Sequence, residues 1–179
     1  MKIGPIQLDP IVFRHVHVEL DANHVPEGYE ASTSASFDFE GVNISTNVGL
    51  SPMDDDESPR RYFVSLRVVI DNSKIDDKDP RVSPYLIDVE AGAAARGMPG
   101  VEALPDMEDL VLVNSTSLLW SAIREQVCSL TARMPAGVAM LPAVSFLDLR
   151  EQNRRQREEQ ALKDATPRDG SARAKARKR

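Results

Sequence analysis

The residues of this chain that could bind a metal ion lie close together near its start. His15 and His17 are two positions apart in an alternating segment, and Glu19 follows at the same spacing. Side chains two apart on a strand share one face, where two imidazoles and a carboxylate could chelate a divalent cation. Histidines on a solvated strand face are more often ordinary polar residues, so we expect no metal site and no cofactor.

Three other patterns each lack a part that their chemistry requires. The acidic run at 54–57 has neither the spaced glycine nor the distant bidentate acid of a calcium loop. The small-residue segment 91–100 could pass for a phosphate-binding loop, but no lysine lies between Lys78 and Lys163. No Gly-x-Ser-x-Gly nucleophile signature accompanies the histidines. We therefore expect no enzyme activity, and we interpret 91–100 as a crossover from the last strand to the helices.

The single cysteine, Cys128, lies in an apolar segment. One cysteine cannot form an intramolecular disulfide, which favours a reducing compartment. No basic leader with an apolar core opens the sequence, and no run of about 18 apolar residues occurs. We expect a cytoplasmic protein without membrane insertion.

The formal net charge of -6 conceals two regions of opposite sign. Residues 1–149 hold 11 basic and 23 acidic side chains, whereas residues 150–179 hold 11 basic and 5 acidic ones. The basic end has no aromatic residue, so it could attract nucleic acid only through salt-sensitive phosphate contacts, which the acidic body would oppose. Nucleic acid is therefore not an expected partner, and 166–179 is expected to be a disordered tail.

Alternating apolar and polar residues predict four strands, all of them before the first helix. This order is typical of an α+β fold with an antiparallel sheet rather than of alternating βαβ units. Gly41 marks a turn or bulge within the second strand. The predicted strands span residues 12–20, 33–46, 62–70 and 85–89.

The helical part begins with a Trp-containing apolar segment. Apolar residues between Leu119 and Leu130 recur at helical spacing and predict one buried stripe. The polar residues 114–117 are suited to accept the first free backbone amides, and Pro135 is expected to end the helix. A second helix is predicted over residues 150–163.

The connector after Pro135 is rich in apolar side chains, although most loops are polar. It contains Val138, Met140, Leu141 and Val144. Such a connector must either pack on the sheet or form the wall of a groove in which an apolar ligand can lie.

The helix and the connector together resemble the SecB family of protein-export chaperones. Residues 118–125, Leu-Leu-Trp-Ser-Ala-Ile-Arg-Glu, are similar to the family's first-helix motif and keep its Arg-Glu pair. Arg133 and residues 141–146, Leu-Pro-Ala-Val-Ser-Phe, are similar to the family's Arg-Gly and Leu-Pro-Pro-Val-Asn-Phe at the family's spacing. Residues 66–68 and 85–89 resemble its third and fourth strands.

This resemblance covers residues 10–150 and includes clear departures. Ser121 and Ala122 replace the family's Pro-Tyr, and Met134 replaces its glycine. Leu147 replaces the aspartate that follows the phenylalanine, and a basic tail replaces a usually acidic one. The chain therefore resembles a divergent member of the family.

The resemblance implies a four-stranded antiparallel sheet followed by two packed helices. The chaperone domain would span residues 8–150, and residues 151–179 would form a helical extension and a disordered basic tail. The implied protein is a cytosolic homotetramer, a dimer of dimers, that holds unfolded preproteins and passes them to the SecA motor. Such a holdase needs no catalytic residue, because apolar grooves bind many extended segments weakly and gain strength through multivalency.

For the client groove the resemblance and the apolar pattern favour six residues, each of which could instead belong to the core. A charge at Leu141 is expected to weaken client binding and leave the fold intact. The six are Phe37, Phe39, Met140, Leu141, Val144 and Phe146.

Two further sets of residues take their expected roles from the resemblance alone. Tyr85, Ile87 and Val89 resemble tetramer-contact positions, with burial inside one chain as the alternative. Glu19 and Asp88 match acids on the outer sheet face that bind a basic, zinc-carrying tail of SecA. His15 stands where a third acid is expected, so two of the three expected acids are present.

Two other interpretations remain open. One is a chaperone of the same fold dedicated to a single client, such as an antitoxin, and the other is an interaction protein that uses its basic tail. Apolar holding should survive moderate salt, whereas association through the tail should not. For a holdase, truncation after Gln152 is expected to leave holding unchanged.

Overall fold

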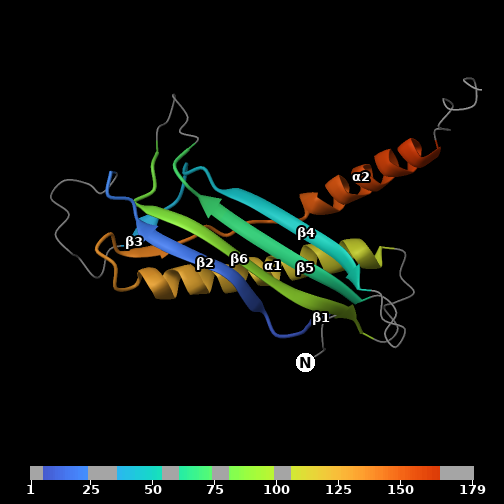
Figure 1. Ribbon diagram of the computed structural model, residues 1–179, viewed down its shortest axis with the longest axis horizontal. Coiled ribbons are helices and arrows are strands. Elements are labelled where there is room, and N and C mark those ends of the chain that lie inside the picture. Colours follow the sequence, from blue (N-terminus) through green and yellow to red (C-terminus); the bar gives the residue numbers. More distant parts are fainter. Residues whose placement is uncertain (1–5, 24–35, 54–60, 74–80, 99–105, 166–179) are drawn as a thin grey trace, which may run out of the picture.

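The computed structural model describes residues 6–23, 36–53, 61–73, 81–98 and 106–165. A twisted antiparallel sheet lies on the long helix α1, and α2 extends away at one end (Figure 1). A short parallel pair, β3 and β7, lies outside the sheet. The elements are β1 Ile6–Leu8, β2 Val12–Leu20, β3 Ser36–Asp38, β4 Ser45–Met53, β5 Arg61–Ile70, β6 Tyr85–Gly97, α1 Met107–Thr131, β7 Val138–Met140 and α2 Asp148–Ala165.

The central strand of the sheet is β6, to which three other strands pair. β5 pairs with one edge of β6, and β4 continues the sheet beyond β5. β2 and then β1 pair with the other edge. All these pairings are antiparallel, so the predicted α+β class with an antiparallel sheet is confirmed. The sheet has five strands rather than the predicted four, because β1 also pairs with β6, and the short strand β7 follows α1.

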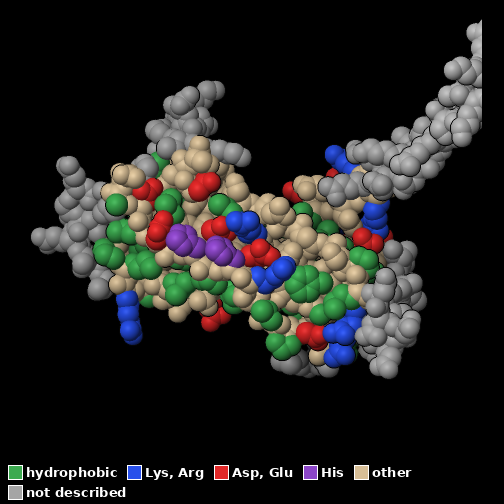
Figure 2. All heavy atoms as spheres, in the orientation of Figure 1, with side chains coloured by type: hydrophobic (Ala, Val, Ile, Leu, Met, Phe, Trp, Pro, Cys, Tyr) green, Lys and Arg blue, Asp and Glu red, His purple; other side chains and the backbone are tan. Residues whose placement is uncertain are grey.

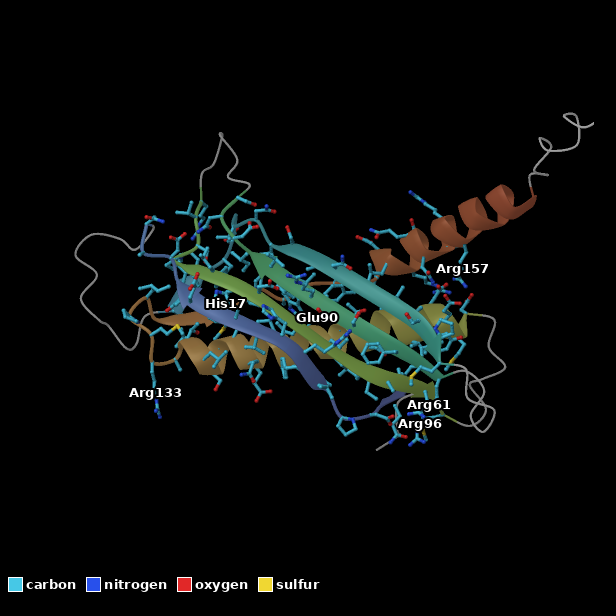
Figure 3. The ribbon with its side chains drawn as sticks, in the orientation of Figure 1. His17, Arg61, Glu90, Arg96, Arg133 and Arg157 are labelled. Carbon is cyan, nitrogen blue, oxygen red and sulfur yellow. The ribbon has the colours of Figure 1, made fainter. Side chains whose placement is uncertain are left out.

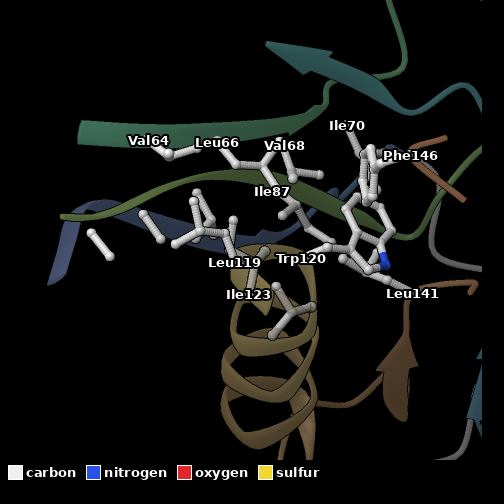
Figure 4. Close-up of a cluster of buried hydrophobic side chains, with 14 of the residues drawn as sticks. Val64, Leu66, Val68, Ile70, Ile87, Leu119, Trp120, Ile123, Leu141 and Phe146 are labelled. Carbon is white, nitrogen blue, oxygen red and sulfur yellow. The ribbon is translucent and has the colours of Figure 1, made fainter. Parts of the chain in front are cut away.

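The core lies between the sheet and α1 (Figure 4). Alternate residues of β5, from Val64 to Ile70, are buried, and so are alternate residues of β6 from Tyr85. Leu119, Ile123 and Val127 of α1 face them and are fully buried. Burial of each such aliphatic side chain stabilises the fold by about 1.5–3 kcal/mol. Because burial is favourable for apolar side chains, their periods of two and 3.6 residues in the sequence predicted which faces of the strands and the helix are packed together.

One predicted strand is displaced in the structure. The described part of the predicted strand 33–46, residues 36–46, does not form a single strand, because Gly41 has a φ of 80° and Val42 N donates to Phe39 O at 3.1 Å. The resulting turn separates β3 from β4, and it is β4 that pairs in the sheet. β4 contains Gly49 and Pro52, which weaken its sequence signal but are tolerated in an edge strand.

The interpretation of residues 91–100 as a flexible crossover was wrong for the part that the structure describes. β6 continues to Gly97, and its small side chains allow close packing. A Cβ on Gly92 would lie 2.6 Å from Cζ of Phe63, and Ala91, Ala93 and Ala95 are buried against α1. These residues are small because neighbouring groups come close.

The long helix also begins earlier than predicted. Residues 114–117 lie inside α1, where Asn114 Nδ2 and Ser117 Oγ donate to carbonyl oxygens one turn earlier rather than accepting the first amides. α1 ends at Thr131, four residues before Pro135. The predicted second helix is confirmed as α2.

Candidate functional site

The connector between α1 and α2 is held in place by hydrogen bonds to three side chains. Trp120 Nε1 donates to the carbonyl oxygen of Pro142 at 3.0 Å, and the Tyr85 hydroxyl donates to that of Gly137. Thr131 Oγ1 accepts a hydrogen bond from Ala139 N at 2.8 Å. Buried polar groups paired in this way fix one geometry, so the connector is an ordered wall rather than a loose loop.

A cavity of about 420 Å³ lies between this connector and the outer side of α1. The connector contributes Met140, Ala143 and Val144, and α1 contributes Trp120 and Cys128. The polar rim consists of Ser117, Ser121, Arg124 and Glu125.

The connector carries exposed apolar side chains, and two of them line this pocket. Met140 is 46% exposed and Val144 is 43% exposed, while Leu147 at the end of the same connector is 70% exposed. Exposed apolar side chains beside a cavity are typical of binding sites in soluble proteins. Together, pocket and connector provide an apolar surface with hydrogen-bonding groups at its edge.

Of the six predicted groove residues, the structure brings only Met140 and Val144 to the pocket. Phe39 is 2% exposed and belongs to the core. Phe37 is half-buried and stacks edge to face on Phe39, with ring centroids 4.8 Å apart. Phe146 is 7% exposed and lies edge to face with Trp120, so it supports the pocket wall from behind.

Leu141 is fully buried, which corrects the expectation that a charge there would leave the fold intact. Met140 is the last residue of β7 and Leu141 follows it, yet Met140 is exposed and Leu141 is fully buried. The apolar pattern alone could not tell them apart, because both residues are apolar. Packing against the core decides which of the two is covered.

The sequence prediction missed the contribution of α1 to the pocket. Ser117, Ser121, Arg124 and Cys128 line one side of it. They recur at spacings of three and four residues beside the buried stripe of the helix, which places them on one face. This spacing is the signal that could have found them.

Tyr85, Ile87 and Val89 are at most 1% exposed, and they face α1. Their side chains fill the core of one chain, which is the alternative that the sequence also allowed. They are therefore not available for contact with a second copy.

The face of the sheet away from α1 carries a row of charged residues and two histidines (Figure 2). Arg67 Nε and Nη2 donate to the two carboxylate oxygens of Asp88 at 2.8 and 2.6 Å. His15 Nε2 lies 3.6 Å from Asp88, and His17 Nε2 lies 3.4 Å from Glu19. The hydrogen bonds from Arg67 lower the pKa of Asp88, and the same contact raises the pKa of Arg67.

Both candidate SecA-binding acids thus have neighbours within their own sheet. Asp88 is engaged at both oxygens, whereas Glu19 is about half exposed. Within the described part of the chain, no group of three or more potential ligands is arranged to bind a metal. The acidic run 54–57 and the tail 166–179 lie outside the described residues.

Neither described helix is both long and apolar enough to cross a bilayer. The fold and the pocket define the chain as an α+β protein with an ordered apolar wall beside its long helix.

The comparisons with solved structures find similar folds. A Mycobacterium tuberculosis SecB-like chaperone in complex with a ChAD peptide from the HigA1 antitoxin is 16% identical, with a TM-score of 0.46, and the match covers 79% of this chain and 88% of that chain. A protein of unknown function from Streptococcus agalactiae is 13% identical, with a TM-score of 0.39, over 79% of this chain and 95% of that one. No protein-family model and no curated protein matches the sequence. These likenesses concern the fold alone.

Proposed function

We propose that this chain is a cytoplasmic holdase that binds extended segments of unfolded polypeptides at the pocket beside α1. The observation that carries the proposal is an ordered connector that leaves Met140 and Val144 exposed over an apolar pocket. An apolar surface held in place by three side-chain hydrogen bonds is prepared for an apolar partner without prior rearrangement.

The chemistry of the pocket suits clients of varied sequence. Met140 is a flexible thioether side chain that adapts to differently shaped partners. The rim residue Arg124 offers N–H donors to the backbone carbonyls that every extended segment presents. The hydroxyls of Ser117 and Ser121 donate to carbonyls one turn earlier in α1, and their oxygens remain as acceptors for the backbone N–H groups of a client. Several copies in a homotetramer would add avidity to weak individual contacts.

The test measures whether the chain suppresses aggregation of an unrelated, slowly refolding protein, with its oligomeric mass determined by light scattering in the same buffer. We expect suppression near an equimolar ratio by a tetramer, and no loss at moderate salt. The double variant Met140→Glu/Val144→Glu should weaken binding of an unfolded client about tenfold or more, because two apolar contacts become charged.

The matched control is Val12→Glu, which replaces an apolar side chain that is 60% exposed on β2 and does not line the pocket. If the double variant and Val12→Glu hold the client equally well, the pocket is not the site of client binding. If the unchanged chain forms a tetramer but does not suppress aggregation, the result would count against a general holdase.

One observation favours the second candidate, a chaperone dedicated to a single client such as an antitoxin. Arg67 already binds both oxygens of Asp88, so the acidic patch that coupling to SecA would require is partly neutralised. A dedicated chaperone needs the pocket but not that patch. Tight, saturable binding of one client, together with no suppression for a panel of unrelated proteins, would favour this candidate over export.

A further inference from the structure

The attachment of α2 to the body of the protein depends on charged groups. After Leu149, α2 has no apolar residue until Ala161. Among the described elements it packs mainly against α1. Helices of soluble proteins usually dock through a broad apolar stripe. α2 lacks such a stripe, so its position must be fixed in another way.

Polar residues occupy the face of α2 that meets α1. Arg150, Asn153 and Arg157 are spaced by three and four residues, which places them on one side of the helix. They meet acids at the beginning of α1, and Figure 3 labels Arg157 between the two helices. The contacts are Arg157 Nη2 to Asp109 Oδ1 at 2.5 Å, Asn153 Nδ2 to Asp109 Oδ1 at 2.7 Å and Arg150 Nη2 to Asp106 Oδ2 at 2.6 Å.

Asp109 is the central residue of this cluster. Its side chain is only 6% exposed, whereas that of Arg157 is 42% exposed. Within the described residues, the side chains that contact its carboxylate all belong to α2. A buried carboxylate is stable only while it is paired, so docking of α2 and pairing of Asp109 are one event.

The same helix forms one side of a second cavity, of about 560 Å³. Val48 and Leu50 of the edge strand β4 lie on one side, and Leu149 and Asn153 of α2 lie on the other. Asn153 therefore both lines the cavity and binds Asp109. Movement of α2 would change the width of the cavity.

We propose that α2 is a movable wall of this second cavity, held closed by the contacts of Asp109 with Arg150, Asn153 and Arg157. Arg150 and Arg157 are partly exposed, so dissolved salt screens their attraction to the carboxylate. The closed state dominates at low ionic strength, and rising salt shifts α2 toward the open state. A helix docked by an apolar stripe would not respond to salt in this direction.

The test measures the distance between spin labels at Asn47→Cys on β4 and Arg154→Cys on α2, in a full-length chain that also carries Cys128→Ser. Arg157→Gln removes one charged partner of Asp109 at a partly exposed position. The matched control is Arg155→Gln, which makes the same change in charge on the same helix. Arg155 is 73% exposed, and its ion pair, with Glu151, lies within α2.

At low salt we expect one short distance in the parent chain and in Arg155→Gln. In Arg157→Gln, the ratio of long to short distances should rise about tenfold or more, because a charged hydrogen bond is lost. Raising the salt concentration to about 1 M, where the Debye length is about 3 Å, should also raise the ratio of long to short distances in the parent chain.

Identical distance distributions in Arg157→Gln and Arg155→Gln would overturn the proposal. Loss of helical circular dichroism in Arg157→Gln would overturn it as well, because α2 would then unfold rather than move. A longer distance with unchanged helicity, in Arg157→Gln alone, supports it.

Discussion

Adjacent residues of the connector have opposite roles. Met140 is 46% exposed at the pocket, whereas Leu141 is fully buried against the core. A single peptide unit therefore separates a residue available to a client from a residue that stabilises the fold. Substitutions in this segment must be interpreted together with a measurement of stability.

Leu141→Asp is expected to destabilise the protein by more than about 3 kcal/mol, because it removes a buried aliphatic side chain and places a carboxylate in its position. Urea denaturation monitored by Trp120 fluorescence measures the change. Met140→Glu serves as the control, and its free energy of unfolding should differ from that of the parent chain by no more than about 0.5 kcal/mol. Equal stability of the two variants would contradict the burial of Leu141.

Asp88 predicts a pH dependence of stability. Because Arg67 lowers its pKa in the folded chain, ionised Asp88 stabilises the fold at pH values above the unfolded pKa of about 3.9. This contribution is lost as the pH falls toward the lower folded pKa.

Between about pH 5 and pH 2.5, Asp88→Asn should therefore lose less free energy of unfolding than the parent chain. Urea denaturation at the two pH values measures the difference. Arg67→Gln should reduce the pH dependence in the same way. Parallel losses in all three proteins would show that the contact between Arg67 and Asp88 does not contribute to the pH dependence of stability.

At the scale of the elements, small side chains and single hydrogen bonds determine how the helices and strands meet. Gly92 allows Phe63 to lie against β6, and the buried alanines of β6 allow α1 to come close. The indole N–H of Trp120 in α1 donates a hydrogen bond to the Pro142 carbonyl and so holds the connector in place. The pocket depends on the Trp120 contact, since it lies between α1 and the connector.

Trp120→Phe tests the attachment of the connector. It retains most of the apolar packing but removes the hydrogen bond to Pro142, so we expect a loss of about 1 kcal/mol of stability. Amide hydrogen exchange should become faster for residues 138–146, while exchange in β5 stays unchanged. Ser121→Ala, at the exposed rim, is the control and should change neither region. Unchanged exchange in Trp120→Phe would mean that the connector is held elsewhere.

At the scale of the whole molecule, charge is divided between an acidic body and a basic end. The cluster around Asp109 joins the two, because α2 supplies cations to acids at the beginning of α1. This contact changes the expectation for truncation after Gln152, since that cut removes Asn153 and Arg157. Asp109 would then keep only its longer contact with Arg150, at 4.0 Å.

Truncation after Ala165 is expected to leave client holding within about twofold of the full chain, because the pocket and the Asp109 contacts remain. Truncation after Gln152 should lower the free energy of unfolding by about 1–3 kcal/mol, since a buried carboxylate loses partners. Aggregation suppression and urea denaturation of both truncated chains provide the measurements. Equal stability of the two would exclude a stabilising role for the cluster.

The sequence by itself determined the class of fold and most of its regular elements. Strands at 12–20 and 62–70, the apolar stripe of α1 and the helix α2 were predictable because burial imposes a period of two or 3.6 residues on the chain. The apolar connector was also visible, since its composition departs from that of an ordinary loop.

Only the tertiary structure decided which apolar residues form the site. Met140 and Leu141 have similar side chains, and Phe39, Val144 and Phe146 have the same apolar character, yet their exposure ranges from 0% to 46%. The extension of β6 through its alanines and the pairing of Asp109 with α2 likewise depend on neighbours far away in sequence. Local periodicity indicates which face of a helix or strand is apolar. The exposure of a side chain on that face depends on which other elements pack against it, and those contacts are between residues far apart in sequence.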